Sequence, residues 1–342
     1  MEKITLIKPD DAHLHLRDGE YLSTTVADSA KRFARAIIMP NLLPPITSLT
    51  QVAAYRDRIL AQVPTGMHFQ PLMTFYLTAE MTPQLVAQAK AAGTIIGFKL
   101  YPKGATTHSD AGVSSLENIY PLLAAMEEFD MPLLIHGESI DSAVDVFDRE
   151  KVFLEELAKL LGRFPKLRMV LEHISTVEAM RFVLAAPSTL AATITAHHLL
   201  LNRNHLLQGG IRPHYYCLPI LKRRDDQQAL IAAATSGHPK FFLGTDSAPH
   251  ALQKKETACG CAGIYSAHAA LELYAEVFEQ QGCLDKLPAF ASQYAADFYR
   301  LPQNTETITL LKKPWQVPEY LDFGHERLIP LRAGEQIEWQ VE

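Results

Sequence analysis

Short apolar runs recur along the chain, and each is followed by a polar turn and then by a stretch with the spacing of an amphipathic helix. Eight of these runs predict β-strands, over residues 4–7, 35–39, 68–77, 95–100, 132–135, 169–172, 190–196 and 241–244. Strands that alternate with helices favour parallel strands joined by crossover helices. An α/β chain with eight of them favours a closed (β/α)₈ TIM barrel over an open doubly wound sheet.

The intervals between these strands have helical patterns, for example over residues 48–63, 83–92, 115–129 and 149–161. Ser48 is a suitable N-cap for the first of these helices. The last helices are predicted over 267–279 and 288–301, and alternation predicts short strands at 307–311 and 336–341. Since no repeat or low-complexity linker suggests a boundary, we expect residues 1–342 to form a single barrel domain with a short C-terminal extension.

The polar residues of the predicted strands gather where barrel enzymes carry their chemistry, at the C-terminal strand ends. The first strand leads into His13 and His15, and the two-residue period of an extended chain directs both imidazoles to one side. Four further strands carry or end in Lys99, His136, His173 and Asp246. Each alone has an ordinary structural explanation, such as a hydrogen-bonded core histidine or a helix-capping aspartate. Their convergence on one barrel mouth favours a metal site.

A protonated lysine among metal ligands would repel a cation, so Lys99 needs another chemical form. Reaction with carbon dioxide gives N6-carboxylysine, a carbamate whose two oxygens can bridge two metal ions about 3.5–4 Å apart. The further ligands of one ion would be His13, His15 and Asp246. Those of the other ion would be His136 and His173. A hydroxide between the cations would be the nucleophile. Imidazoles suit zinc, so we expect two Zn²⁺ ions per subunit.

Composition and charge argue against several classes of function. The net charge is −6 without a basic block, which argues against a nucleic-acid surface. No apolar run approaches a membrane span, and the acidic N-terminal stretch is not typical of a secretory signal. The number and spacing of the four cysteines do not indicate a disulfide framework. Cys259 and Cys261 lack the second cysteine pair that a zinc ribbon requires. We therefore expect a cytoplasmic protein with reduced thiols and no membrane partner.

Most of the remaining histidines are interpreted as background. His197 and His198 follow the seventh predicted strand, but the expected ligand set is complete without them. No comparable pattern surrounds His68, His108, His205, His214, His238, His268 or His325.

Several short motifs follow one another along essentially the whole chain: Asp11-Ala-His-Leu-His-Leu-Arg17, Met39-Pro-Asn41, Gly97-Phe-Lys-Leu-Tyr101, His136-Gly-Glu138, Glu172-His-Ile174, Gly210-Ile-Arg-Pro-His214, Cys217-Leu-Pro-Ile-Leu-Lys222 and Leu243-Gly-Thr-Asp-Ser-Ala-Pro-His250. In kind and order they resemble the amidohydrolase superfamily, and within it the shorter, bacterial-type (class II) dihydroorotases. The most type-specific pair is Thr245-Asp-Ser-Ala-Pro-His250 with Cys259-Gly-Cys-Ala-Gly263.

The resemblance implies a zinc-dependent cyclic amide hydrolase of pyrimidine biosynthesis, which interconverts N-carbamoyl-L-aspartate and L-dihydroorotate. In the hydrolytic direction, the hydroxide attacks the ring carbonyl next to the ring methylene. Asp246 takes the proton of the hydroxide and delivers it to the departing amide nitrogen. The resemblance also suggests a homodimer.

Substrate recognition needs groups away from the metals. Arg17 offers a bidentate guanidinium to the free carboxylate, with Asn41 and His250 as additional donors. The resemblance also places backbone groups of Leu218 and Ala262 against the pyrimidine edge.

The segment over residues 103–112 is long for a loop between a strand and a helix, and glycines near both ends could act as hinges. The ordinary interpretation is a solvated surface loop. The alternative is a lid, in which Thr106 and Thr107 fold onto the substrate and donate hydrogen bonds.

Two alternatives to this function stay open at the level of sequence. A related hydantoinase or dihydropyrimidinase would act on cyclic amides without a carboxylate, and Arg17 would then lack a partner. A non-catalytic scaffold on the same barrel would be expected to have lost its ligands, whereas all six are present.

Overall fold

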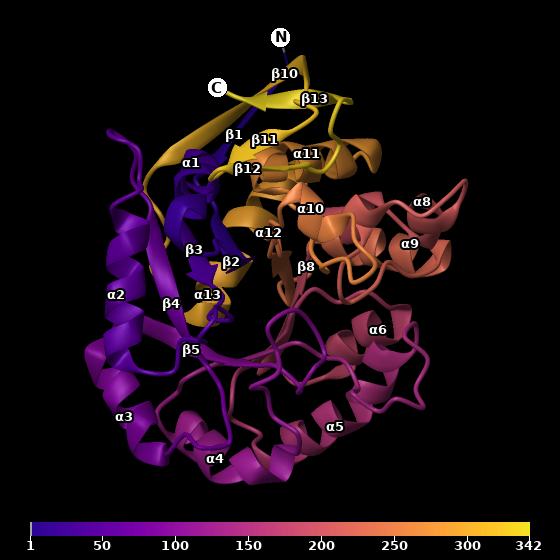
Figure 1. Ribbon diagram of the computed structural model, residues 1–342. Helices are drawn as coiled ribbons and strands as arrows, with labels where there is room; N and C mark the ends of the chain where they lie inside the picture. Colours follow the sequence, from indigo (N-terminus) through magenta and orange to yellow (C-terminus); the bar gives the residue numbers. More distant parts are fainter. Residues whose placement is uncertain (1) are drawn as a thin grey trace.

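The computed structural model describes residues 2–342 and confirms the (β/α)₈ barrel (Figure 1). Eight parallel strands are hydrogen-bonded in sequence order: β2 (Asp10–Leu14), β3 (Arg35–Ile38), β4 (Gln70–Tyr76), β5 (Ile95–Leu100), β6 (Leu133–Ile135), β7 (Met169–Leu171), β8 (Leu190–Ile194) and β9 (Phe241–Leu243). At the mouth, the Asp246 N–H donates to the His13 carbonyl at 2.9 Å and the His15 N–H to the Ser247 carbonyl at 3.1 Å. These bonds join the end of the last strand to the first.

The prediction of residues 4–7 as the first barrel strand is wrong. That segment lies in β1 (Lys3–Ile7), which pairs antiparallel with β10 (Thr307–Gln316) in a separate sheet completed by β13 (Gln336–Val341). The first barrel strand is β2, whose sequence Asp-Asp-Ala-His-Leu lacks an apolar run although all five residues are buried. Its polar residues are buried because they carry the site and its supports. The short strands predicted near the C-terminus are confirmed, and β10 extends beyond its predicted end.

Helices cover the outside of the barrel, as Figure 1 shows. Their bounds are α1 (Leu22–Arg32), α2 (Leu49–Leu60), α3 (Pro83–Ala92), α4 (Tyr120–Glu128), α5 (Arg149–Arg163), α6 (Val177–Ala185), α7 (Ala196–Leu200), α8 (Arg203–Leu207), α9 (Arg224–Ala234), α10 (Leu252–Lys255), α11 (Ala270–Gln280), α12 (Leu287–Ser292) and α13 (Tyr294–Tyr299). The hairpin of β11 (Leu321–Phe323) and β12 (Glu326–Leu328) lies near the C-terminus. Ser48 is confirmed as the α2 N-cap, in a capping box with Gln51.

Two predicted helices are divided in the structure. The pattern over 115–129 begins as a tight turn at Leu116–Ile119 and becomes α4 only at Tyr120, where Pro121 fits the first helical turn. The pattern over 288–301 becomes α12 and α13, which meet at Gln293.

Alternation along the strands separates two apolar layers. Along each strand, every second side chain packs outwards against the helices, as Ile38 of β3 and Leu133 and Ile135 of β6 do. The alternate set forms an inner cluster from different strands, closed by α13: Ala12, Ile37, Met39, Leu72, Leu134, Val170, Ala191, Phe242, Ala295 and Tyr299. This packed interior gives the polar residues of the mouth a rigid floor.

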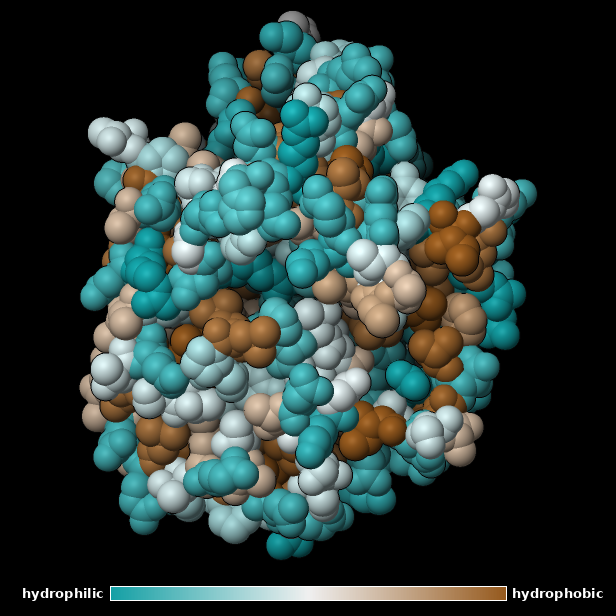
Figure 2. Space-filling view, in the orientation of Figure 1, coloured by the Kyte–Doolittle hydropathy of each residue, from teal (hydrophilic) through white to brown (hydrophobic). Residues whose placement is uncertain are grey.

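The surface is mainly hydrophilic in the orientation of Figure 2, with an apolar group over the α8 region. Leu207 and Ile211, at the end of α8 and in the loop after it, are 50% and 79% exposed. Within residues 2–342 no helix combines the length and apolar character that crossing a membrane requires.

Candidate metal centre and active site

Three side chains at the barrel mouth bring their donor atoms together. Nε2 of His13 lies 3.1 Å from Nε2 of His15 and 3.2 Å from Oδ1 of Asp246, and the distance from His15 Nε2 to Asp246 Oδ1 is 3.1 Å. Ligands of a tetrahedral zinc ion with bonds of about 2.0–2.1 Å lie about 3.3 Å apart. This triangle therefore fits one face of a zinc site.

Asp11 holds this triangle in place. Its carboxylate accepts the backbone N–H of His13 at 3.1 Å and, from the β9 end, the backbone N–H of Thr245 at 2.8 Å and the Thr245 hydroxyl at 2.6 Å. The side chain is fully buried, and burial raises the pKa of Asp11 to about 6 against the opposing effect of these hydrogen bonds. Asp11 thus couples the strand that carries the histidines to the strand that precedes Asp246.

The other two predicted histidines lie next to this cluster. His173 follows β7, and its ring centroid is 5.1 Å from that of His13 and 4.8 Å from that of His136, which follows β6. Nε2 of His136 is 2.8 Å from Oε2 of Glu138. A carboxylate in this place orients an imidazole and increases its basicity as a ligand.

Lys99 of β5 is completely buried beneath the same group and forms an ion pair with Glu172. The other Glu172 oxygen lies 3.1 Å from Nδ1 of His13. Burial lowers the pKa of Lys99 more strongly than the carboxylates of Glu172 and Asp246 raise it. A lowered pKa favours the neutral amine, which is the form that reacts with carbon dioxide.

The sequence prediction missed Asp11, Glu138 and Glu172 as supports, although each stands one or two residues from a predicted ligand. In extended chain, the two-residue spacing sends Asp11 and His13 to one side, and likewise His136 and Glu138. This spacing was the available signal. Glu172 precedes His173 directly and had no signal of that kind.

The protonation states differ among the histidines of this cluster. Burial lowers the pKa of His15 to about 4 and holds that of His173 well below its usual value, so both rings are neutral and able to ligate. Burial also acts to lower the pKa of His13, but Glu172 and Asp246 raise it to about 9. Nδ1 of His173 has no hydrogen-bond partner within residues 2–342. His15 and His173 are thus neutral donors, one of them with an unpaired nitrogen, and a metal ion at this place would displace the proton that the two carboxylates hold on His13.

All predicted ligands except Lys99, and all predicted substrate contacts except His250, line one narrow cavity of about 20 Å³. Room of this size holds about one water molecule. Five metal-ligand candidates and six substrate-contact candidates border it: His13, His15, His136, His173, Asp246, Arg17, Asn41, Thr106, Thr107, Leu218 and Ala262, together with the unpredicted Tyr101. His250 stands behind this lining, with Nε2 2.9 Å from Arg17 Nη2 and 3.0 Å from the Ala262 carbonyl oxygen.

Arg17 presents a cation to this cavity. Its Nε donates to the Pro249 carbonyl at 2.9 Å, and its backbone adopts a left-handed φ of 63°. Among residues 2–342, the polar side-chain contacts of its guanidinium are with the Pro249 carbonyl and His250 Nε2, and none is an ion pair with a carboxylate. The group is therefore free to pair with an anionic ligand.

The loop over residues 103–112 is folded over the cavity. The Thr107 hydroxyl donates to the Ala262 carbonyl at 3.3 Å, and the Asn41 amide donates to the Thr107 carbonyl at 3.1 Å. The Thr106 N–H donates to the Ser109 hydroxyl within the loop at 2.9 Å. A substrate the size of a pyrimidine ring exceeds the remaining space, so its entry requires this loop or its neighbours to move.

Comparison with known proteins shows the family of this chain. Residues 4–317 match the model of the amidohydrolase family. The chain belongs to the amidohydrolase family. Over its whole length it is 60% identical to a dihydroorotase of Teredinibacter turnerae, covering 99% of that protein. This amidohydrolase branch is metal-dependent, in accord with the clusters of histidine and acidic residues at the mouth.

Two solved amidohydrolase structures share the fold over nearly the full length. A dihydroorotase from Campylobacter jejuni is 38% identical with a TM-score of 0.92, over 99% of this chain and 97% of that one. A dihydroorotase from Saccharomyces cerevisiae, in complex with 5-fluoroorotic acid, is 35% identical with a TM-score of 0.92, over 100% and 99%.

Proposed function

We propose that this protein is a dihydroorotase, which catalyses the reversible cyclisation of N-carbamoyl-L-aspartate to L-dihydroorotate and water in pyrimidine biosynthesis. The main support for this proposal is that Arg17 faces the same cavity as the cluster of His13, His15 and Asp246. Among residues 2–342, the Arg17 cation has no carboxylate partner. The full-length identity to dihydroorotases supports the same activity.

The runner-up, a hydantoinase or dihydropyrimidinase, fits this cavity less well. Its substrates lack the carboxylate that Arg17 would bind, and a cation at the cavity wall would then disfavour an uncharged ring. The yeast relative binds 5-fluoroorotic acid, a pyrimidine that carries a carboxylate, which supports the same preference here.

For the metal centre, we propose two zinc ions per subunit, bridged by carbamylated Lys99. The residues that would hold them, besides Lys99, are His13, His15 and Asp246 for one ion, and His136 and His173 for the other. The chemistry that such ions would supply is polarisation of the ring carbonyl and a lowered pKa for a water molecule. Carbamylation joins the neutral Lys99 amine to carbon dioxide and releases one proton.

The protein side chains then have distinct tasks. Asp246 accepts the proton of the attacking water and transfers it to the amide nitrogen as the ring opens, and the direction reverses in biosynthesis. Glu138 orients His136, and Glu172 orients His13. Arg17, with Asn41 and His250, holds the substrate carboxylate, while backbone groups of Leu218 and Ala262 meet the pyrimidine edge.

The proposed activity is tested by following dihydroorotate hydrolysis spectrophotometrically after zinc loading, with a hydantoin as the comparison substrate. We expect dihydroorotate to be turned over far faster, and a chelator to abolish the activity until zinc is restored. Equal rates on both substrates would favour the runner-up, and full activity after verified metal removal would exclude the proposed centre.

Arg17→Met is expected to weaken dihydroorotate binding strongly, because it removes a charge-assisted pair with the carboxylate. The loss should be on the order of 2–5 kcal/mol. Steady-state kinetics on dihydroorotate and on dihydrouracil, which lacks the carboxylate, measure it.

The control is Arg58→Met, since Arg58 is exposed, pairs with Asp18 at 2.7 Å and does not line the cavity. We expect unchanged metal content in both variants. Equal losses on the two substrates in Arg17→Met would contradict the role.

The double variant Thr106→Ala/Thr107→Ala is expected to lower kcat as well as raise KM. One neutral hydrogen bond contributes about 0.5–1.5 kcal/mol, so loss of a contact alone would cost only several-fold. If closure of the loop also completes the catalytic geometry, the loss is larger and falls on both constants.

The two single variants and the metal content complete that experiment. Each threonine should contribute, and metal content should stay at the wild-type level. Wild-type kcat and KM in the double variant would show that residues 103–112 are an ordinary surface loop and not a lid.

Three broader expectations stay predictions: a single domain over residues 1–342, a cytoplasmic location and a homodimer. The exposed apolar side chains of Leu207 and Ile211 offer one surface for contact between subunits. Sedimentation of the purified protein measures the oligomeric state.

A further inference from the structure

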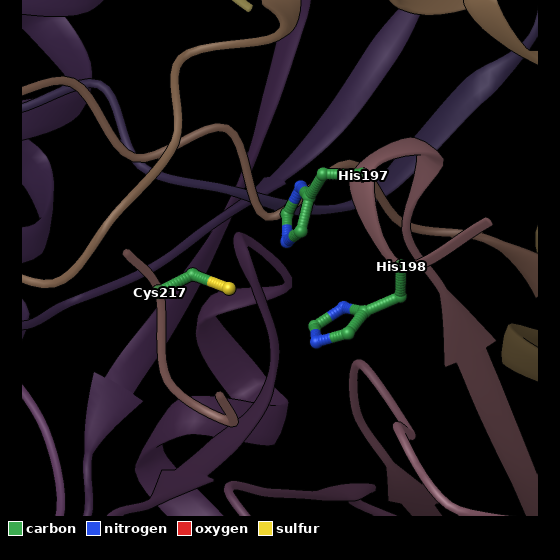
Figure 3. A group of neighbouring side chains, drawn as sticks. All are labelled: His197, His198 and Cys217. Carbon is green, nitrogen blue, oxygen red and sulfur yellow. The ribbon is translucent and has the colours of Figure 1, made fainter. Parts of the chain in front are cut away.

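Two histidines and a cysteine meet in the interior beside the barrel mouth, outside the centre described above. His197 and His198 belong to α7, and Cys217 lies in the segment that precedes α9. One donor atom of each lies within 4.8 Å of the others. Figure 3 shows the sulfur and one nitrogen of each ring turned towards a common space. All three residues are buried.

The hydrogen bonds of His198 define which of its ring nitrogens carries the proton and which carries a lone pair. Its Nε2 lies 3.0 Å from the Pro219 carbonyl oxygen, and since a carbonyl only accepts, Nε2 carries the proton. The lone pair is then on Nδ1, which accepts the Thr195 hydroxyl at 2.8 Å. Histidines that bind metals commonly donate their other N–H to a backbone carbonyl in this way, which fixes the ring and its tautomer.

His197 lacks any such explanation within the protein. Its ring is completely buried, and neither nitrogen has a hydrogen-bond partner within residues 2–342. Buried polar atoms without a partner are rare, and an ion is one of the reasons for them. Burial holds the pKa of His197 well below its usual value and lowers that of His198 to about 4, so both imidazoles are neutral.

We propose that His197, His198 and Cys217 form a third metal site, which binds a borderline or soft divalent cation such as Zn²⁺, Co²⁺ or Cd²⁺. Two imidazoles and a thiolate are the donors that these ions prefer in tetrahedral sites. The cation replaces the thiol proton, which leaves to solvent, and no electron is transferred. The Thr195 hydroxyl turns away from Nδ1, and a water molecule completes the coordination.

The thiol proton is the main barrier to occupancy. Burial raises the pKa of Cys217 to about 12, with Asp246 contributing in the same direction. The thiol therefore stays protonated until a cation displaces the proton, and occupancy rises with pH. Because Leu218 follows Cys217 directly and lines the catalytic cavity, the bound ion would tie α7 to the substrate-binding segment.

Titration with Co²⁺ of enzyme that holds two equivalents of Zn²⁺ per chain, enough for the proposed catalytic centre alone, tests this site independently of the proposed activity. None of the ligands proposed for the catalytic centre contains sulfur, so a thiolate-to-cobalt charge-transfer band in the near ultraviolet reports a cysteine ligand. We expect the band to saturate at one Co²⁺ per chain. Absence of the band at saturating Co²⁺ would overturn the proposal.

Cys217→Ser should abolish the band and bind one metal ion per chain fewer than the wild type. Cys283→Ser is the matched control, because Cys283 is a free cysteine that follows α11 and is not part of this group of donors, and it should keep both. His197→Gln keeps a polar side chain and should weaken Co²⁺ binding at least tenfold, which also decides the matter if Cys217→Ser does not fold. An undiminished charge-transfer band in Cys217→Ser or in His197→Gln would exclude the site.

Discussion

Lys99→Ala is expected to reduce dihydroorotate turnover to background and to remove at least one of the two proposed metal ions. The side chain is completely buried between Glu172 and the ligand histidines, so no neighbouring group can take its place. Without the bridge, two cations would face each other with less anionic charge between them. Metal analysis and steady-state kinetics of the purified variant measure both losses.

A short carboxylic acid should restore part of the activity of Lys99→Ala, because it can enter the space left by the side chain and supply two oxygens. Lys313→Ala, at an exposed position of β10, is the control and should behave as wild type. Two tightly held ions in Lys99→Ala would contradict the bridging role. Mass spectrometry under non-denaturing conditions can also detect the carbon dioxide adduct directly.

Asp246→Asn is expected to lower kcat by at least ~10²–10⁴, the usual value of a positioned general acid–base group. The amide keeps the shape but can neither accept the proton nor bind a cation as an anion. Asp57→Asn, on the exposed face of α2, is the control. Metal content must be measured in parallel, because Asp246 lies 3.1–3.2 Å from two ligand nitrogens. A kcat within a few-fold of wild type would exclude the proton-transfer role.

The proton-transfer role of Asp246 also predicts how the rate of hydrolysis changes with pH. Burial acts to raise the pKa of Asp246, but His13 and the other imidazoles hold it well below its usual range. The carboxylate therefore stays ionised through the mildly acidic range, and the rate of hydrolysis should fall as first the attacking hydroxide and then Asp246 take up protons. A flat profile down to strongly acidic pH would contradict this assignment.

The sequence by itself determined the barrel and the main chemistry of its mouth. Seven of the barrel strands follow from short apolar runs in the sequence. A strand that is covered on both faces requires such a run wherever it lies in the chain. The strand-end residues His136, His173 and Asp246 were predictable for a related reason. In a parallel barrel, every C-terminal strand end meets at one mouth, so position along the chain gives position in space.

Only the tertiary structure decided which segment is the first barrel strand. The apolar run of β1 pairs with β10, more than 300 residues away, while the polar segment of β2 enters the barrel. A polar strand can be buried when its side chains find partners from other strands, as Asp11 does in Thr245. Those partners lie far apart in sequence, and no local pattern contains them.

The same reason applies to Glu172, to the folded loop over residues 103–112, and to the cluster of His197, His198 and Cys217. A buried charge is tolerated only where a second group compensates for its desolvation. For Lys99 that group is 73 residues away in the sequence, and for the loop it is the Ala262 carbonyl, 155 residues from Thr107. Local periodicity fixes which face of a strand is buried, whereas the closed barrel decides which buried groups meet.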